Sequence, residues 1–142
     1  MFLFSYGSNH PVQLADRLGH DVRDARAAYV EDWQRVFRGW SRRWKGGVAS
    51  LVKKPRAVTY GYVARIDSAD LDALDRYEGV ASGNYMRSTL KATTADGRDV
   101  AAVVYVASSR DFNAPSNAYL KAVAKTVGTF WADVSPESFP IR

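Results

Sequence analysis

The order of hydrophobic and polar residues predicts a chain built mostly of strands, with three helices. Runs that are rich in β-branched and aromatic residues, or that alternate between apolar and polar, are typical of strands. Such segments cover residues 2–6, 27–44 with an interruption near Gly39, 46–52, 57–66, 85–93 and 99–107. We expect the basic residues 53–56 to form a loop between two of these strands, and Asp96-Gly97 to form a hairpin turn between the last two.

Three further segments have the periodicity or the end signals of helices. They cover residues 11–18, 67–78 and about 116–130. Pro11 suits a first helical turn, and Gly19 suits the position after the last turn. Asp67 or Ser68 can cap the second helix, and Ser116 can cap the third. Together the strands and helices indicate an α+β fold whose sheet curls towards a barrel.

Composition indicates one domain without metal or membrane features. The chain has 142 residues, of which 46% are hydrophobic, and this is enough for a single core, so we expect one domain over residues 1–142. The absence of cysteine excludes disulfides, and two histidines, His10 and His20, argue against a zinc site. The first apolar run ends at Phe4, and no apolar stretch approaches the ~20 residues that span a bilayer. We therefore expect a cytoplasmic protein with no membrane partner.

The formal net charge of +5 favours anionic partners, either nucleic acid or a small acidic metabolite. Residues 33–45 interleave aromatic and basic side chains, as does a surface that stacks single-stranded nucleic acid. The same pattern is typical of strands that turn one face to the core and their arginines to solvent, and we favour this second interpretation. His20, next to Gly19, is expected to be a solvated turn residue.

One position in the second helix combines an inward direction with an ionisable side chain. At ~100° per residue, Leu71 and Leu74 define an apolar face whose centre lies within about 10° of Glu78, whereas Asp75 lies about 70° away. Partial burial and the negative end of the helix dipole would both raise the pKa of this glutamate, which could then exchange protons near neutral pH. In the alternative interpretation, the side chain reaches solvent at the helix end or pairs with an arginine.

The residues after the first strand, Tyr6-Gly7-Ser8-Asn9, also allow two interpretations. Consecutive backbone N–H groups in front of a helix attract a carboxylate or an oxyanion. Alternatively, these residues form an ordinary strand-to-helix turn, in which Gly7 supplies a special backbone angle and Asn9 caps the helix.

Taken together, several stretches resemble the γ-glutamylcyclotransferase family, whose fold is also called AIG2-like. The similarity begins at residues 6–9 and is densest from Leu74 to Val80 and from Ser82 to Tyr85. It also includes residues 44–49, 61–63, 105 and 115–119. Because these stretches have the order and spacing of the family over roughly residues 2–125, the resemblance is specific.

The resemblance implies a small closed or strongly curled mixed β-barrel with flanking helices. It also implies an enzyme, a transferase or lyase that converts a small γ-glutamyl substrate to 5-oxoproline and a free amine. The glutamate that matches Glu78 is the family's general acid/base, and the loop that matches residues 6–9 holds the substrate through backbone N–H groups. Tyrosines that match Tyr85, Tyr105 and Tyr119 line the same cavity. Because the substrate's own α-amine is the nucleophile, the reaction needs no metal and no cofactor.

Asn9 departs from the leucine that the glutathione-specific branch of the family tends to carry after Tyr-Gly-Ser. This difference argues for γ-glutamyl amino acids or γ-glutamyl amines as substrates. The N–H groups of residues 7–9 suit either the substrate's α-carboxylate or the reacting oxyanion. An alternative function is a non-catalytic binding module on the same scaffold, which would recognise an anionic ligand or nucleic acid through residues 33–45. The sequence does not indicate an oligomeric state.

Overall fold

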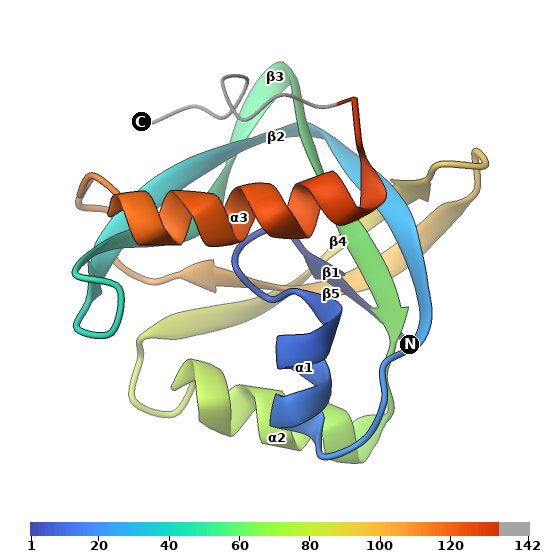
Figure 1. Ribbon diagram of the computed structural model, residues 1–142, viewed down its shortest axis with the longest axis horizontal. Helices are drawn as coiled ribbons and strands as arrows, with labels where there is room; N and C mark the ends of the chain where they lie inside the picture. The colour runs from blue at the N-terminus through green and yellow to red at the C-terminus, as the bar shows by residue number, and fades with distance from the viewer. Residues whose placement is uncertain (134–142) are drawn as a thin grey trace.

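Within residues 1–133, which the computed structural model describes, five strands close into a barrel and three helices flank it (Figure 1). The strands are β1 (Phe2–Ser5), β2 (Arg23–Ser41), β3 (Gly46–Arg65), β4 (Tyr85–Thr94) and β5 (Asp99–Ala107). The helices are α1 (Pro11–Leu18), α2 (Ser68–Glu78) and α3 (Asn117–Phe130). The last nine residues of the domain expected over 1–142 lie outside the described residues.

The barrel is mixed because its shortest strand closes it. Around the barrel the strands follow the order β1-β3-β2-β4-β5, and β1 pairs antiparallel with β3 and parallel with β5. Phe2 of β1 lies opposite Arg65 on one side and Ala102 on the other. The expected α+β class and the expected small mixed barrel with flanking helices are therefore confirmed.

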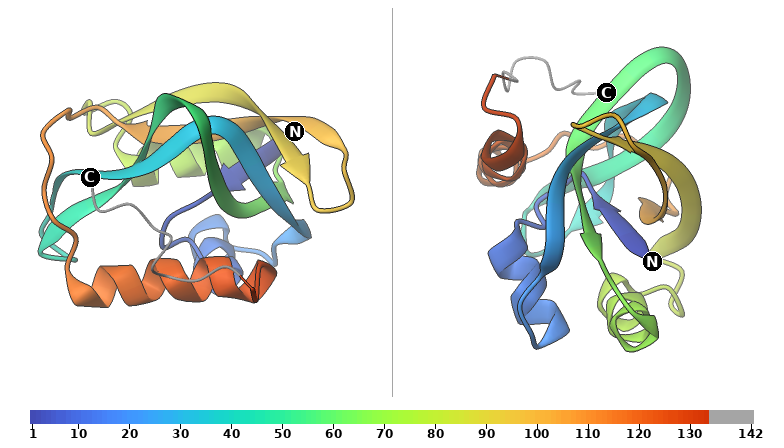
Figure 2. Two further views of the ribbon diagram at one scale, coloured as in Figure 1. Left: turned by 90° about the horizontal axis from the view of Figure 1, so that it is seen from above. Right: turned by 90° about the vertical axis from the view of Figure 1, so that its right-hand side faces the viewer.

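The three helices lie where the sequence predicted them. In Figure 1, α1 and α2 lie next to each other below the barrel, and both views of Figure 2 show α3 along its side, where it packs against β3. Asp67 caps α2 and Ser116 caps α3, each by accepting a backbone N–H with its side chain. Gly79 ends α2 in the left-handed conformation, with φ of 68°, and this fixes where the helix stops directly after Glu78.

The long strands β2 and β3 differ from the prediction at two places. The expected interruption at Gly39 does not end β2, although this glycine has a φ of 66°. The expected loop at residues 53–56 is wrong, because these residues belong to β3, where residues 54–57 bulge out opposite the single residue Asp32. The backbone N–H of Arg56 donates to Asp32 Oδ1 at 2.9 Å, so a side chain satisfies the bulge and the strand continues.

Two hydrophobic clusters hold the fold together. The larger fills the barrel beneath α3 and includes Phe4, whereas the smaller lies between the barrel and the helices α1 and α2 and includes Leu3. Leu14 of α1 and Leu74 of α2 are fully buried in the smaller cluster, and burying one leucine contributes about 1.5–3 kcal/mol. Both helices are therefore fixed against the same end of the barrel, where the cavity described below opens.

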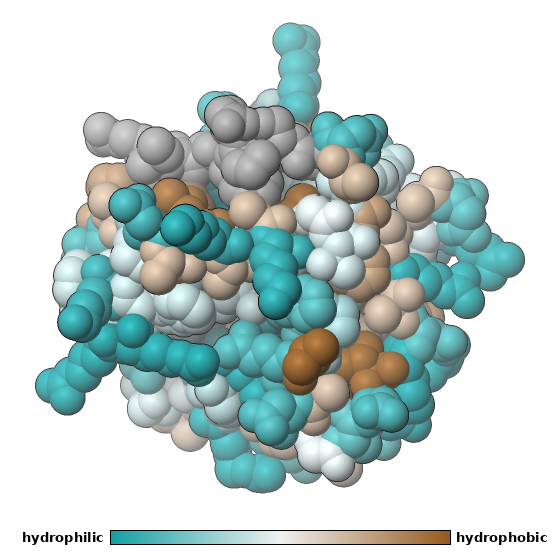
Figure 3. Space-filling model, in the orientation of Figure 1, coloured by the Kyte–Doolittle hydropathy of each residue, from teal (hydrophilic) through white to brown (hydrophobic). Residues whose placement is uncertain are grey.

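The outer surface is mostly polar on the side drawn in Figure 3, which carries α3 and only small hydrophobic areas. In the described part of the chain, no helix is both long enough and apolar enough to cross a bilayer.

Candidate active site

A cavity of about 480 Å³ opens where the loop after β1, the end of α2, the β2–β3 turn and α3 come together. The cavity is lined by all the site residues that the sequence predicted, namely Tyr6, Gly7, Ser8, Asn9, Glu78, Tyr85, Tyr105 and Tyr119. These residues come from segments that are far apart in the chain, and closure of the barrel brings them to one place.

The loop of residues 6–9 is anchored from three sides. The Tyr6 hydroxyl donates to the backbone oxygen of Tyr105 at 2.6 Å, and the Tyr6 carbonyl accepts from Arg35 Nε at 2.9 Å. At the other end of the loop, the Tyr62 hydroxyl donates to the Asn9 carbonyl at 2.5 Å. The carbonyls of Tyr6 and Asn9 thus position the loop.

The loop's N–H groups remain available to a ligand. Within residues 1–133, the backbone N–H groups of Gly7, Ser8 and Asn9 donate to no protein acceptor. Three consecutive donors at the wall of a cavity form a concave site for an anion. This arrangement favours the anion-binding interpretation of the loop over that of a plain turn.

Two residues of the loop have roles that differ from the expected turn. Gly7 does not adopt a positive φ; a Cβ there would lie 3.2 Å from the Tyr119 hydroxyl, so the glycine allows close packing instead. Asn9 does not cap α1, because His10 does so, with its Nδ1 accepting from the Val12 N–H at 3.3 Å. The Asn9 side chain is therefore free to enter the site.

Glu78 lies at the last position of α2 with its side chain 14% exposed. Burial raises the pKa of Glu78, and this effect is opposed by the charge of Arg17 and by a hydrogen bond from the Asn9 side chain. Arg17 Nη1 lies 3.8 Å from Glu78 Oε1. The inward direction and the raised pKa are both as predicted, and the arginine pairing of the alternative interpretation is present as well.

Arg17 is a site residue that the sequence reasoning missed. Its side chain is only 10% exposed, its Nη1 donates to Asn9 Oδ1, and its guanidinium carbon lies 3.8 Å from the centre of the Tyr77 ring. Arg17 therefore joins the loop to the end of α2. Its position in the sequence could have indicated this, because Arg17 lies about one helical turn after Leu14, the buried residue of α1, and so on the same face of the helix.

Arg35 corrects the expected placement of the arginines in residues 33–45. Its side chain does not face solvent: the residue is 3% exposed, and besides Tyr6 it donates from Nη2 to the Tyr60 carbonyl at 2.7 Å. Val36 and Phe37 are buried as well, so burial does not alternate along this part of β2 and a period of two gave no signal for Arg35. Burial lowers the pKa of Arg35 to about 10, so its charge persists at neutral pH and favours an anion beside the loop.

The three remaining tyrosines use their hydroxyl groups differently. Tyr119 accepts from the Ala49 N–H at 2.8 Å, and Tyr105 donates to Asp75 Oδ1 at 2.6 Å. The Tyr85 hydroxyl forms no hydrogen bond with the part of the chain described here. The pKa of each of these three tyrosines is raised, mainly by burial, and that of Tyr119 is raised to about 12. All three hydroxyl groups are therefore neutral near pH 7 and can donate a hydrogen bond.

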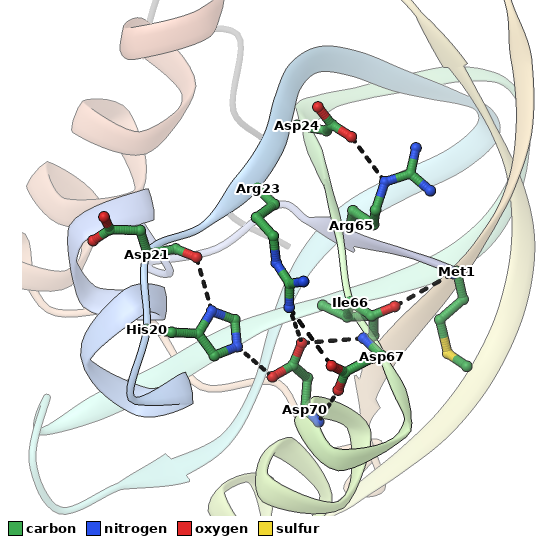
Figure 4. Close-up of polar contacts among 9 residues, drawn as sticks. All are labelled: Met1, His20, Asp21, Arg23, Asp24, Arg65, Ile66, Asp67 and Asp70. Carbon is green, nitrogen blue, oxygen red and sulfur yellow. Dashed lines mark hydrogen bonds and ion pairs between the residues drawn. The ribbon is translucent and has the colours of Figure 1, made fainter.

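A polar cluster fixes the opposite end of α2 (Figure 4). Asp67 and Asp70 accept each other's backbone N–H groups, and Asp70 also lies 3.5 Å from Arg23 Nη2. His20 is exposed in a bend after α1, as expected, and it also has a partner, because its Nε2 lies 2.6 Å from Asp70 Oδ1. The cluster joins the segment after α1 to the start of α2 and so helps to fix the direction in which Glu78 points.

Among the residues of known placement, no three histidine, aspartate or glutamate side chains gather as a metal site would require. The cavity thus offers amide donors, tyrosine hydroxyls, the guanidinium groups of Arg17 and Arg43, and the carboxyl group of Glu78, whose pKa is raised. Such a set can bind an anionic substrate and transfer a proton.

Comparison with known proteins places this chain in a family. The model of the AIG2-like family matches residues 58–129, just over half of the chain, and the chain therefore belongs to the AIG2-like family. The gamma-glutamylcyclotransferases of Mus musculus and Homo sapiens are each 29% identical to it over 129 residues. These alignments cover 84% of this chain and 66% of each relative, so the chain spans just under two thirds of their length. The resemblance seen in the sequence is confirmed.

Solved structures share the barrel. One named gamma-glutamyl cyclotransferase superposes with a TM-score of 0.89 at 22% identity, over 99% of this chain and 88% of that chain. A gamma-glutamyl cyclotransferase specific to glutathione, from yeast, superposes with a TM-score of 0.68 at 13% identity, over 98% of this chain and 90% of that chain. At such identities the likeness shows the common fold, in agreement with the predicted architecture.

Proposed function

We propose that this chain is a γ-glutamylcyclotransferase-type enzyme that converts a γ-glutamyl amino acid or γ-glutamyl amine to 5-oxoproline and a free amine. The observation that carries the proposal is the meeting, in one cavity, of the Glu78 carboxyl group with the N–H groups of residues 7–9, which donate to no acceptor among residues 1–133. Family membership and the names of the relatives support the same reaction class.

The reaction is an aminolysis within one molecule. The substrate's α-ammonium group gives a proton to the Glu78 carboxylate, and the resulting amine attacks the γ-carbonyl carbon. A carbon–nitrogen bond forms in the five-membered ring, the amide bond to the departing nitrogen breaks, and Glu78 returns the proton to that nitrogen. The ring nitrogen loses one further proton, which passes to the released amine, so the products are the lactam and an ammonium group. The atoms balance without water, metal or cofactor, since the substrate is split into 5-oxoproline and the amine.

Burial suits Glu78 to both halves of this cycle. A carboxyl group whose pKa is raised is a stronger base when ionised, and near neutral pH a larger fraction of it is protonated and able to act as an acid than in a solvated glutamate. The pairing with Arg17 favours the ionised form of Glu78, although burial disfavours it.

The cavity also supplies orientation. The loop N–H groups hold an anion of the γ-glutamyl half, either its α-carboxylate or the oxygen that becomes negative during attack. Arg35 behind the loop adds positive potential, and Tyr85 offers a hydroxyl that has no hydrogen-bond partner in the described part of the chain. Holding the amine about 3–3.5 Å from the γ-carbonyl carbon would supply much of the rate enhancement.

The direct test is to measure 5-oxoproline after incubation with a panel of γ-glutamyl amino acids and γ-glutamyl amines. Glu78→Gln keeps the shape and hydrogen-bonding capacity of the side chain but cannot take the proton, so release should fall by a factor of 10² or more. Asp72→Asn, an exposed change on the same helix, is the control and should retain full activity. Undiminished turnover by Glu78→Gln would refute the assigned role. A panel without any 5-oxoproline would favour the binding module.

A further inference from the structure

The outer part of the cavity is lined by aromatic residues that remain exposed. Trp40 and Tyr77 both line the same cavity as Glu78, yet 66% of Trp40 and 52% of Tyr77 are open to solvent. Large rings left exposed beside a concave site are typical of ligand contact, because they gain by being covered. The reaction proposed above assigns them no role.

Arg43 lies at the same edge and keeps its charge uncompensated. Its Nη1 lies 3.5 Å from the Tyr77 hydroxyl, and no carboxylate among residues 1–133 lies within 4.0 Å of it. Arg17 of the same cavity, by contrast, is paired with Glu78. Arg43 is therefore a cavity-lining guanidinium whose charge no described carboxylate balances, and it can pair with an incoming carboxylate.

The position of these residues relative to Glu78 decides which part of a substrate would reach them. Tyr77 directly precedes Glu78 in α2, and the Arg17 guanidinium contacts both of them, at 3.8 Å in each case. The departing nitrogen has to lie beside Glu78 to receive its proton. Because the γ-glutamyl half is held by the loop of residues 6–9, the group attached to that nitrogen extends towards the exposed edge.

We infer that Trp40, Tyr77 and Arg43 form a leaving-group subsite for an amino acid with an aromatic or large apolar side chain. The side chain covers the two rings, and its carboxylate pairs with Arg43. This inference rests on the proposed function and narrows it: γ-glutamyl derivatives of such amino acids are better substrates than those of small amino acids or of amines without a carboxylate.

Four substrates separate the two features of the leaving group. They are γ-glutamyl-phenylalanine, γ-glutamyl-phenethylamine, γ-glutamyl-glycine and γ-glutamyl-methylamine. The first two have the aromatic ring and the last two lack it, whereas the first and third have the leaving group's carboxylate and the second and fourth lack it. For the unchanged protein, kcat/KM should be about three- to tenfold higher with the ring than without it. It should be about two- to fivefold higher with the carboxylate than without it, since the pair is partly solvated.

Two variants assign these preferences to residues. Trp40→Ala should remove most of the ring preference, so that the ratio of kcat/KM for γ-glutamyl-phenylalanine to that for γ-glutamyl-glycine falls towards one. Arg43→Gln should remove the carboxylate preference and keep the ring preference. Arg42→Gln, an exposed neighbour that does not line the cavity, is the control and should change neither ratio.

The outcomes distinguish a failure of the subsite from a failure of the proposed function. Release of 5-oxoproline from all four substrates at equal kcat/KM would overturn the subsite and leave the proposed function standing. Equal effects of Arg42→Gln and Arg43→Gln would overturn the role of Arg43. Release from none of the four would overturn the proposed function, and the subsite with it.

Discussion

Replacing Tyr119 with phenylalanine tests whether its hydroxyl group supports the cavity wall. In the structure this hydroxyl accepts the Ala49 N–H at 2.8 Å, within a buried region. Phenylalanine would leave that N–H buried without an acceptor, which costs about 1–3 kcal/mol. Since a domain of this size has a free energy of unfolding of about 5–15 kcal/mol, the loss is measurable by urea denaturation. We expect Tyr119→Phe to lower the free energy of unfolding by that amount.

Tyr85→Phe is the matched comparison. The Tyr85 hydroxyl lines the same cavity and has no partner within residues 1–133, so its removal should change the free energy of unfolding by no more than about 0.5 kcal/mol. The same change should instead reduce 5-oxoproline formation, because the hydroxyl would be available to the substrate. The reasoning is refuted if Tyr119→Phe is as stable as the unchanged protein, or if Tyr85→Phe loses as much stability as Tyr119→Phe.

Two further predictions concern pH. The acid limb of the plot of kcat/KM against pH should report the ionisation of Glu78. Because the charge of Arg17 lowers the pKa of Glu78, Arg17→Met should move that limb to higher pH. An acid limb that does not move would contradict the pairing of Arg17 with Glu78. The hydrogen bond to Asp70 raises the pKa of His20 above its ordinary value of 6.5. The imidazolium therefore contributes stability that is complete below about pH 6.5 and is lost as the pH rises through the raised pKa. In urea denaturation, His20→Gln should weaken this loss of stability with rising pH, whereas equal pH dependence in both proteins would exclude the pairing.

Local signals sufficed for the helices and the hairpin, and failed where distant chain segments decide the structure. The cap at Asp67 and the stop at Gly79 act within a few residues, so α2 could be bounded from the sequence. Residues 53–56 contain the basic and proline residues of a loop. Their inclusion in β3 depends on Asp32 of the neighbouring strand, which propensity alone does not reveal.

The site was predictable where one helix or one motif determined it. The direction of Glu78 follows from the positions of Leu71 and Leu74, and the loop of residues 6–9 follows from the family pattern. The burial of Arg35 was not foreseen, since it depends on backbone acceptors from Tyr6 and Tyr60 that meet only when the barrel closes. An arginine in an aromatic-rich strand is ordinarily at the surface, and its tertiary partners override that tendency here.

The short strand β1 determines when during folding the site can exist. Its four residues pair with β3 and β5, whose residues follow it by tens of positions, up to Phe2 against Ala102. Such pairings require long chain loops to close first, which slows their formation. The loop of residues 6–9 follows Ser5, which pairs with Tyr62 of β3, and the Tyr6 hydroxyl also bonds Tyr105 of β5, so the loop has all these contacts only once β5 has joined the barrel. Because Tyr119 of α3 also lines the cavity, a chain still under synthesis has no assembled cavity until most of its length has been made.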